Sequence, residues 1–143
     1  MHAILHDFPI ACSPQQLFHA ITTPAGLDTW WTATSRGEPT VGNRYELGFG
    51  PEYAWLAEVT ACERDVLFEL RMTHAMPDWM DTRVAFRLQP IDGGTRLEFA
   101  HTGWREQSAH YRTTSFCWAM YLRVMRRNLE FGELVEYERR LEV

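Results

Sequence analysis

Three residues carry side chains that could move protons: His74, His101 and Tyr111. Histidine titrates near neutral pH, and a nearby carboxylate such as Asp78 or Glu106 can orient it and tune its basicity. Together the three would act as proton donors or acceptors on a bound polar aromatic compound. The alternative is that His101 is a half-buried polar residue that packs and hydrogen-bonds locally.

Other chemistries are excluded or unsupported by residue type. All fourteen basic residues are arginines, so a Schiff-base lysine and a phosphate-binding lysine are excluded. The three cysteines, Cys12, Cys62 and Cys117, stand far apart, which indicates reduced thiols rather than disulfides or a zinc site. The sequence contains no motif for a metal or a nucleotide, so we expect neither a metal nor a cofactor.

The composition is that of a folded protein of modest size. The 143 residues are 45% hydrophobic and 23% charged, and we expect one domain over residues 1–143. The net charge of −5 argues against a nucleic-acid partner. No apolar run reaches the length of a membrane span, and the first residues do not read as a signal peptide, so we expect a cytoplasmic protein.

The elements that must position these residues follow from hydrophobic periodicity. Proline follows both Ser13 and Thr23, which predicts two short capped helices, the second running through Trp30 and Trp31 with only one indole facing inward. A helical stripe predicts one long helix from Ser108 to Glu138, which Gly132 ends or bends. Six segments alternate apolar and polar residues as half-buried strands do: 4–10, 41–49, 53–62, 65–74, 81–90 and 94–102.

This order predicts an α+β fold, with a curved antiparallel six-stranded sheet wrapped around the long C-terminal helix and two short helices between strands 1 and 2. The space between sheet and helix either encloses a hydrophobic cavity or is filled by large side chains. In an antiparallel sheet alternate strands run the same way, so the loops near Phe49, Asp78 and Trp104 gather at one end. The long helix also begins there, and we expect this end to be the mouth of the cavity.

The residues expected to bind a ligand combine inward-facing strand positions, one stripe of the long helix, and histidine and tryptophan at the mouth. His74 and His101 continue the inward parity of their strands and should lie roughly 10 Å apart, too far for both to bind one metal directly. The full set is Trp55, Met72, His74, Trp79, Phe86, Phe99, His101, Trp104, Trp118, Tyr121, Leu122 and Met125.

Several stretches carry a family resemblance and together span nearly the whole chain. They are Ser13–Pro24, Trp30–Thr32, Pro39–Tyr45, Gly93–Leu97, His101–Trp104, Trp118–Leu122 and Leu129–Glu133. In these residues and their order the chain resembles the START-like (SRPBCC) superfamily, and within it the branch named after the activator of the heat-shock-90 ATPase. The resemblance implies the helix-grip fold. It also implies kinship with hydrophobic-ligand carriers, polyketide cyclases and aromatases, and co-chaperone domains.

Three functional hypotheses remain open on the sequence. The leading one is a module that binds a hydrophobic or aromatic small molecule between sheet and helix. The second is a cyclase-, aromatase- or hydrolase-like enzyme that uses His74, His101 and Tyr111. The third is a co-chaperone-like domain whose partner is a chaperone or another protein. A second apolar stripe with Met120 and Phe131 either packs internally or forms a homodimer contact, so both a monomer and a homodimer are open.

Overall fold

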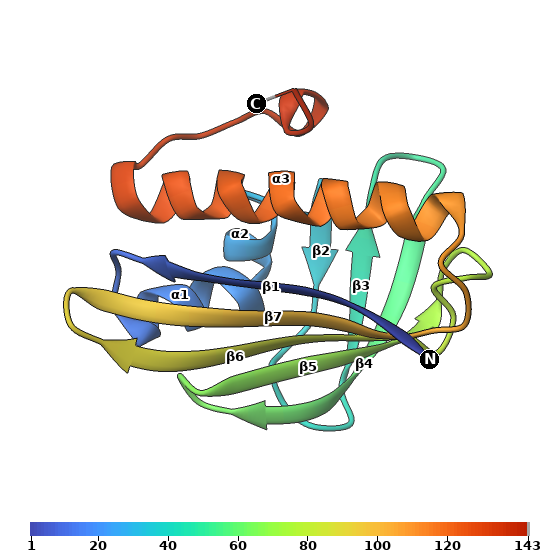
Figure 1. The fold of residues 1–143 in the computed structure, drawn as a ribbon, viewed down its shortest axis with the longest axis horizontal. Coiled ribbons are helices and arrows are strands. Elements are labelled where there is room, and N and C mark those ends of the chain that lie inside the picture. The colour runs from blue at the N-terminus through green and yellow to red at the C-terminus, as the bar shows by residue number, and fades with distance from the viewer. Residues whose placement is uncertain (143) are drawn as a thin grey trace.

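A computed structural model describes residues 1–142 of the chain. A long helix lies across one face of a single antiparallel sheet. Two short helices lie on the same side of the sheet as the long helix (Figure 1). The sheet order is β1-β7-β6-β5-β4-β3-β2. The elements are β1 (His2–Ile10), α1 (Pro14–Thr22), α2 (Pro24–Leu27), β2 (Thr34–Arg36), β3 (Arg44–Gly48), β4 (Ala54–Glu63), β5 (Leu67–His74), β6 (Arg83–Ile91), β7 (Gly94–Trp104), α3 (Ala109–Phe131) and the 3-10 helix η1 (Tyr137–Arg139).

The α+β architecture, with one antiparallel sheet and a long C-terminal helix, is confirmed, but the sheet formed by residues 1–142 has seven strands rather than six. The additional strand, β2, lies between the second short helix and the predicted strand 41–49, where the sequence predicts no strand. It is only three residues long and pairs with β3 through Ser35 and Leu47. Three residues are too few for an alternating pattern to be recognised, so periodicity could not reveal this edge strand.

The longer strands bury one face as their alternation predicts. Phe68, Leu70 and Met72 of β5 are fully buried, while the residues between them are partly exposed. The turn between β6 and β7 contains Gly93 at a φ of 80°, a left-handed conformation that glycine adopts without steric cost. One face of the sheet therefore supplies the floor of the core.

The short helices start as predicted, but the second ends early. Ser13 and Gln16 form a capping box at α1, and the Thr23 side chain accepts from the backbone of Gly26 at α2. The prediction that Trp30 and Trp31 share a helix is wrong, because α2 stops at Leu27 and the two residues lie in a turn. Because neighbouring residues in a turn need not point about 100° apart as they do in a helix, both indoles are buried, at 0% and 2% exposure.

Gly132 ends the long helix, which is one of the two outcomes that the sequence left open for that residue. Ser108 caps α3 as expected, but the helix ends at Phe131 rather than Glu138. Gly132 follows at a φ of 70° and donates its backbone N–H to the carbonyl of Asn128, which is a left-handed helix end. No helix within residues 1–142 is long and apolar enough to cross a membrane.

The segment after α3 folds back over the side of that helix that faces away from the sheet (Figure 1). Arg140 fixes it there and is only 4% exposed. Its guanidinium donates to the backbone carbonyls of Val135, Thr32 and Asp28. The C-terminal segment is thereby joined to the turn that follows α2.

Candidate functional site

A pocket opens at the end of the fold where the β3–β4 and β5–β6 loops meet the N-terminal half of α3. This is the end that the sequence predicts for the mouth of a cavity. The pocket has a volume of about 270 Å³, near the lower end for small-molecule sites. Its walls are mostly aromatic and are formed by Trp31, Phe49, Tyr53, Trp55, Met76, Trp79, His110, Thr114, Cys117, Trp118, Tyr121 and Tyr137.

The tryptophans extend from this pocket into the core as one connected set. Every one of the six tryptophans has another within 6.1 Å, so the pocket wall is continuous with the core packing. The core tryptophans therefore pack against the pocket wall and support it. The centroid distances are 5.9 Å for Trp30–Trp31, 5.0 Å for Trp31–Trp118, 6.0 Å for Trp118–Trp79, 4.9 Å for Trp79–Trp55 and 6.1 Å for Trp79–Trp104.

Aromatic side chains occupy the space under the middle of α3. The rings of Phe86 and Phe99 lie 5.4 Å apart, and Phe99 lies 4.6 Å from Trp118. Trp30 packs edge-on against Phe86 at 6.0 Å. The space predicted between the sheet and the middle of the helix is thus packed core, and the pocket is confined to one end.

The structure brings four of the twelve predicted ligand-binding residues to the pocket: Trp55, Trp79, Trp118 and Tyr121. The remaining eight lie elsewhere. Most are core residues with 0–1% exposure, and His74 is exposed. Leu122 is buried and also lines a separate groove on the other side of α3. The residues outside the pocket are Met72, His74, Phe86, Phe99, His101, Trp104, Leu122 and Met125.

His101 is fully buried behind the pocket wall, with both ring nitrogens occupied. Its Nδ1 accepts from the Nε1–H of Trp118 at 3.0 Å, so in the neutral ring Nε2 carries the hydrogen. Nε2 donates to the Thr82 hydroxyl at 2.8 Å, and that hydroxyl donates to the carbonyl of Trp79. Burial, together with a smaller contribution from the nearby His110, lowers the pKa of His101 from 6.5 to about 3. His101 is therefore a neutral structural residue at neutral pH.

His74 does not point inward, which corrects the parity predicted for it. On β5, Met72 pairs with Ala57, whereas His74 pairs with Leu56, so Thr73 is an extra residue in the ladder. Such a bulge shifts the following side chain to the opposite face. His74 is exposed as a result.

Tyr111 also lies away from the pocket. Its hydroxyl donates to the carbonyl of Ala3 at 2.8 Å, and its ring packs edge-on against Trp104 at 5.3 Å. The three residues proposed for proton transfer are thus an exposed His74, a buried His101 and a Tyr111 that anchors β1. The structure does not bring them together.

The titratable pair at the pocket is instead His110 with Asp78. His110 Nδ1 lies 2.6 Å from Asp78 Oδ2, and both side chains are about one-third exposed, at 35% and 36%. His110 comes from α3 and Asp78 from the β5–β6 loop, so the pair joins two walls of the pocket. A carboxylate on Nδ1 leaves Nε2 as the nitrogen that can meet a ligand.

Sequence reasoning missed the residues that reach the pocket from loops and from the polar side of α3. His110, Thr114, Cys117 and Tyr121 follow one another at intervals of four, three and four, which places them on one helix face. That spacing could have identified these four residues as one face of the helix, although they are too polar to form a recognisable hydrophobic stripe. The missed residues are Trp31, Phe49, Tyr53, Met76, His110, Thr114, Cys117 and Tyr137.

Two pocket residues keep their protons at neutral pH. Burial raises the pKa of the Cys117 thiol above its ordinary value, and burial raises the pKa of Tyr121 to about 12. Cys117 is therefore not poised as a nucleophile. Residues 1–142 also contain no group of three or more histidine, cysteine or acidic side chains that could hold a metal ion.

The chain is similar in sequence and in fold to known proteins. The family model described as Activator of Hsp90 ATPase homolog 1-like protein matches residues 11–130. The search of curated proteins gave no match. Among solved structures, the Aha1 dimer from Colwellia psychrerythraea is 28% identical, with a TM-score of 0.85 over 93% of this chain and 99% of that chain.

Two more distant structures share the fold. A protein from Mesorhizobium loti is 23% identical, with a TM-score of 0.81 over 93% of this chain and 100% of that chain. CalU16 from Micromonospora echinospora is 18% identical, with a TM-score of 0.76 over 98% of this chain and 81% of that chain. The fold thus recurs nearly end to end at low sequence identity.

Proposed function

Because the chain belongs to the family of Activator of Hsp90 ATPase homolog 1-like proteins, whose fold is consistent with ligand binding, we propose that it binds a small aromatic molecule in the end pocket. The observation that carries the proposal is the pocket wall, in which eight of the twelve lining residues are aromatic. Concave sites lined by aromatic side chains with a few polar groups are typical of small-molecule binding.

The pocket suits a flat ligand of one or two rings. Its volume of about 270 Å³ is small, and Trp31, Trp55 and Trp118 offer ring faces and edges for stacking. A ligand that buries about 250 Å² of apolar surface gains about 6 kcal/mol before the cost of ordering. Without any cost that gain would correspond to a Kd of about 40 μM, so burial alone supports only millimolar or weaker binding once the entropy of association is subtracted, and polar contacts must supply the rest.

Polar groups at the pocket set the orientation of such a ligand. His110 and Thr114 present a ring nitrogen and a hydroxyl from α3. Trp79 is 94% buried and its indole nitrogen has no hydrogen-bond partner among residues 1–142. An unpaired buried donor is costly, so a small shift of the indole that brings this N–H to a ligand acceptor would be favourable.

Native mass spectrometry of the purified protein tests the proposal by revealing any retained compound. Affinity is then measured by titration with a naphthol or indole derivative. Cys117→Phe should fill the pocket and weaken binding at least tenfold. Thr113→Phe adds the same ring to an exposed position of α3 outside the pocket and should leave binding unchanged.

Thiol labelling supplies an internal control in the wild-type chain. A bound ligand should slow alkylation of Cys117, which lines the pocket, and leave Cys62 unaffected, since both thiols are partly buried but only Cys117 touches the site. Equal protection of both cysteines, or equal affinity in the two phenylalanine variants, would place the ligand elsewhere and contradict the proposal.

The second candidate is a co-chaperone-like role, which the similarity to the Colwellia Aha1 favours. Its contacts would lie on the outer surface, where Phe116 and Leu134 are 63% and 77% exposed. Stimulation of a heat-shock-90 ATPase by the purified chain would support this role, and the absence of stimulation at saturating concentration would count against it. Sedimentation velocity decides between a monomer and a homodimer.

A further inference from the structure

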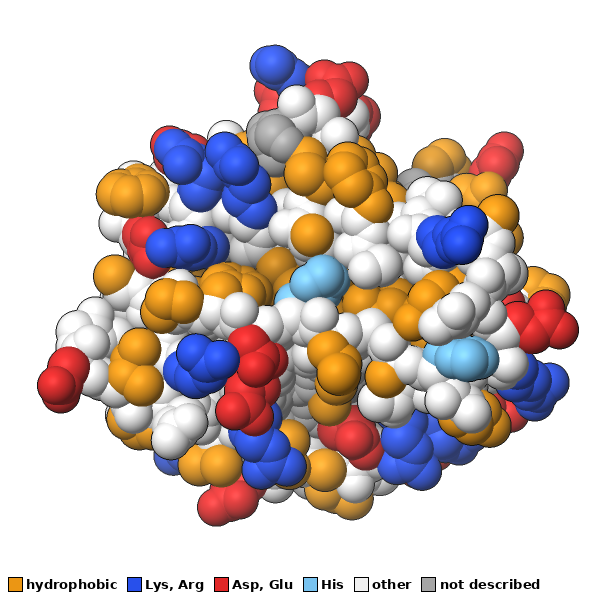
Figure 2. Space-filling model, viewed as in Figure 1, with side chains coloured by type: hydrophobic (Ala, Val, Ile, Leu, Met, Phe, Trp, Pro, Cys, Tyr) orange, Lys and Arg blue, Asp and Glu red, His pale blue; other side chains and the backbone are white. Residues whose placement is uncertain are grey.

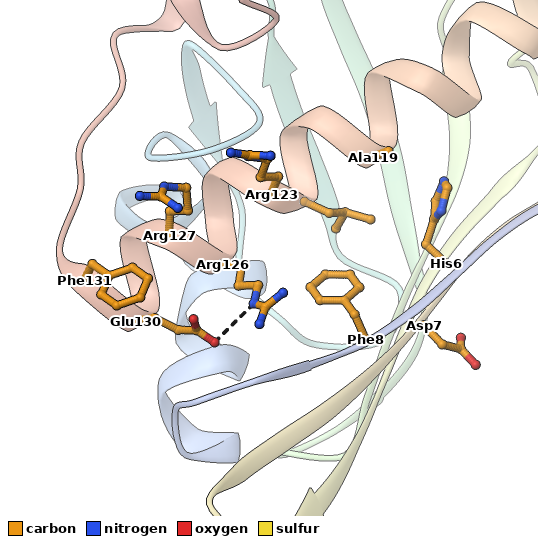
Figure 3. A pocket seen from close by; sticks show the side chains of 10 residues that line it. His6, Asp7, Phe8, Ala119, Arg123, Arg126, Arg127, Glu130 and Phe131 are labelled. Carbon is orange, nitrogen blue, oxygen red and sulfur yellow. Dashed lines mark hydrogen bonds and ion pairs between the residues drawn. The ribbon is translucent and has the colours of Figure 1, made fainter. Parts of the chain in front are cut away.

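A second hollow lies between β1 and the C-terminal half of α3, and it shares no lining residue with the end pocket (Figure 3). Its volume is about 520 Å³, larger than that of the end pocket. We call it the β1–α3 groove. The residues that line it are His6, Asp7, Phe8, Ala119, Leu122, Arg123, Arg126, Arg127, Glu130 and Phe131.

The interior of the groove is apolar. The side chains of His6 and Phe8 rise from β1 toward α3, because alternate residues of a strand share one face (Figure 3). Ala119 and Phe131 line it from the helix, and Phe131 is 67% exposed. A ligand here would cover apolar surface that is now open to water.

The upper rim of the groove is basic. Figure 2 shows Arg side chains gathered over the left end of α3, above a hollow lined with hydrophobic atoms. Arg127 donates two hydrogen bonds of 2.6 Å to the carboxylate of Glu133. Arg126 uses only its Nε, which donates to Glu130. Arg123 makes no ion pair or side-chain hydrogen bond within residues 1–142.

Acidic residues neutralise part of this charge, since Glu130 pairs with Arg126 and Glu133 with Arg127, and they leave Arg123 as the uncompensated cation of the rim among residues 1–142. Asp7 points away from the groove in Figure 3 and pairs with Arg96 at 3.3 Å. The Glu130 carboxylate accepts from the backbone N–H of Ala11 as well as from Arg126, and the hydrogen bond from Ala11 is the largest cause that lowers its pKa. Because Ala11 follows β1, this bond also joins the two walls and closes one end of the groove.

The ring of His6 forms part of the β1 wall of the groove. The Nε2 atom of His6 is buried and has no hydrogen-bond partner among the described residues. It lies in a side chain that lines the groove opposite the arginines (Figure 3). In the Nε2–H tautomer this atom is an unpaired donor behind the groove surface.

We propose that the β1–α3 groove binds a small amphipathic carboxylate, an acid with an apolar tail. Arg123 and Arg126, three residues apart on one helix face, present their guanidinium groups to the carboxylate, and a guanidinium matches a carboxylate in a fork of two hydrogen bonds. The tail lies over Phe8 and Ala119. This proposal is independent of the function assigned to the end pocket.

Titration with decanoate, decanol and acetate, each below the concentration at which it aggregates, tests the proposal by calorimetry and NMR. Decanoate should bind and shift the resonances of Phe8, Leu122 and Phe131. Decanol lacks the charge and acetate lacks the tail, so each should bind at least tenfold more weakly. Equal affinity for decanol and decanoate, or no binding of decanoate, would overturn the proposal.

Variants isolate the arginines from general charge effects. Arg123→Gln with Arg126→Gln should weaken decanoate binding at least tenfold. The control pair, Arg105→Gln with Arg112→Gln, removes the same charge from exposed positions outside the groove and should change affinity less than twofold. Ala119→Phe fills the groove while keeping every charge and should also weaken binding. Wild-type affinity in the glutamine pair or in Ala119→Phe would exclude this site.

Discussion

His101 shows how neighbouring side chains fix the state of a single residue. It receives a hydrogen bond from Trp118 and passes one to Thr82, so its neutral form is fully satisfied within the core. A proton added to Nδ1 would face the indole N–H, and the charge would lie among aromatic rings. One of the three residues considered for proton transfer is therefore used to specify the packing of Trp118.

This arrangement predicts that stability falls with acidity. The pKa of His101 is about 3 in the folded chain and about 6.5 when unfolded, so between these values only the unfolded state takes up the proton. The free energy of unfolding should be constant above pH 6.5 on this account and lower by about 2 kcal/mol at pH 5. Urea denaturation at pH 7 and pH 5 measures the difference.

A substitution assigns that difference to the residue. His101→Gln should lose the 2 kcal/mol dependence on pH, since glutamine does not titrate. His19→Gln removes an exposed histidine from α1 and should keep the wild-type dependence. Parallel curves for His101→Gln and wild type would show that another group is responsible.

At the level of the elements, α3 lines two hollows with different parts of its surface. The face with His110, Thr114 and Cys117 lines the end pocket, while Arg123 and Arg126 line the β1–α3 groove. Where α3 ends decides where the chain turns back, since the following segment brings Tyr137 to the pocket. The residue that ends the helix, Gly132, thus positions part of the site.

Gly132→Ala should lower the free energy of unfolding by about 1 kcal/mol, because a Cβ at a φ of 70° meets the following carbonyl. Nothing crowds the position, so the cost is conformational rather than steric contact with neighbours. Gly132→Asn should cost less, because asparagine tolerates this conformation. Chemical denaturation of both variants checks the order, and an alanine variant as stable as wild type would refute it.

The elements were largely predictable because their signals are local. The capping residues Ser13 and Thr23 and the alternation in β5 identify starts and faces that the structure confirms. The bulge at Thr73 was not predictable, because Met72, Thr73 and His74 continue an unbroken alternation in sequence. Only the pairing with β4 decides that His74 turns outward.

The pocket was predictable in place but only partly in composition. Strand direction alone gathers the loops at one end, and Trp55 and Trp79 were identified there. Loop residues such as Phe49 and Tyr53 follow no period, so no pattern says which way they face. Whether the space under α3 is hollow depends on how Phe86 and Phe99 interlock, which is a property of three-dimensional packing.

Over the whole molecule, a few hydrogen bonds tie α3 and the chain after it to distant segments. The Tyr111 hydroxyl donates to Ala3, Glu130 accepts from Ala11, and Arg140 donates to Thr32. Each bond joins residues more than one hundred positions apart. The C-terminal part of the chain thereby holds the N-terminal third in place.

Arg140→Ala should release the C-terminal segment and lower the free energy of unfolding by about 1–3 kcal/mol, because three carbonyls lose a charged donor. Arg139→Ala, at a 72% exposed side chain, should change stability by less than about 0.5 kcal/mol. Hydrogen exchange should show faster exchange over residues 133–142 only in Arg140→Ala. Equal protection in both variants would show that the Arg140 bonds do not hold the segment.

The connected tryptophans have an optical consequence. Rings whose centroids lie 4.9–6.1 Å apart have coupled transition dipoles, so light absorbed by one indole is shared with the others. We expect paired bands of opposite sign in the near-ultraviolet circular dichroism. Emission from the whole set should also report any change at Trp55, at the open end. Ligand binding at the open end can thus be followed by the intrinsic tryptophan signal of the native chain, with no added dye.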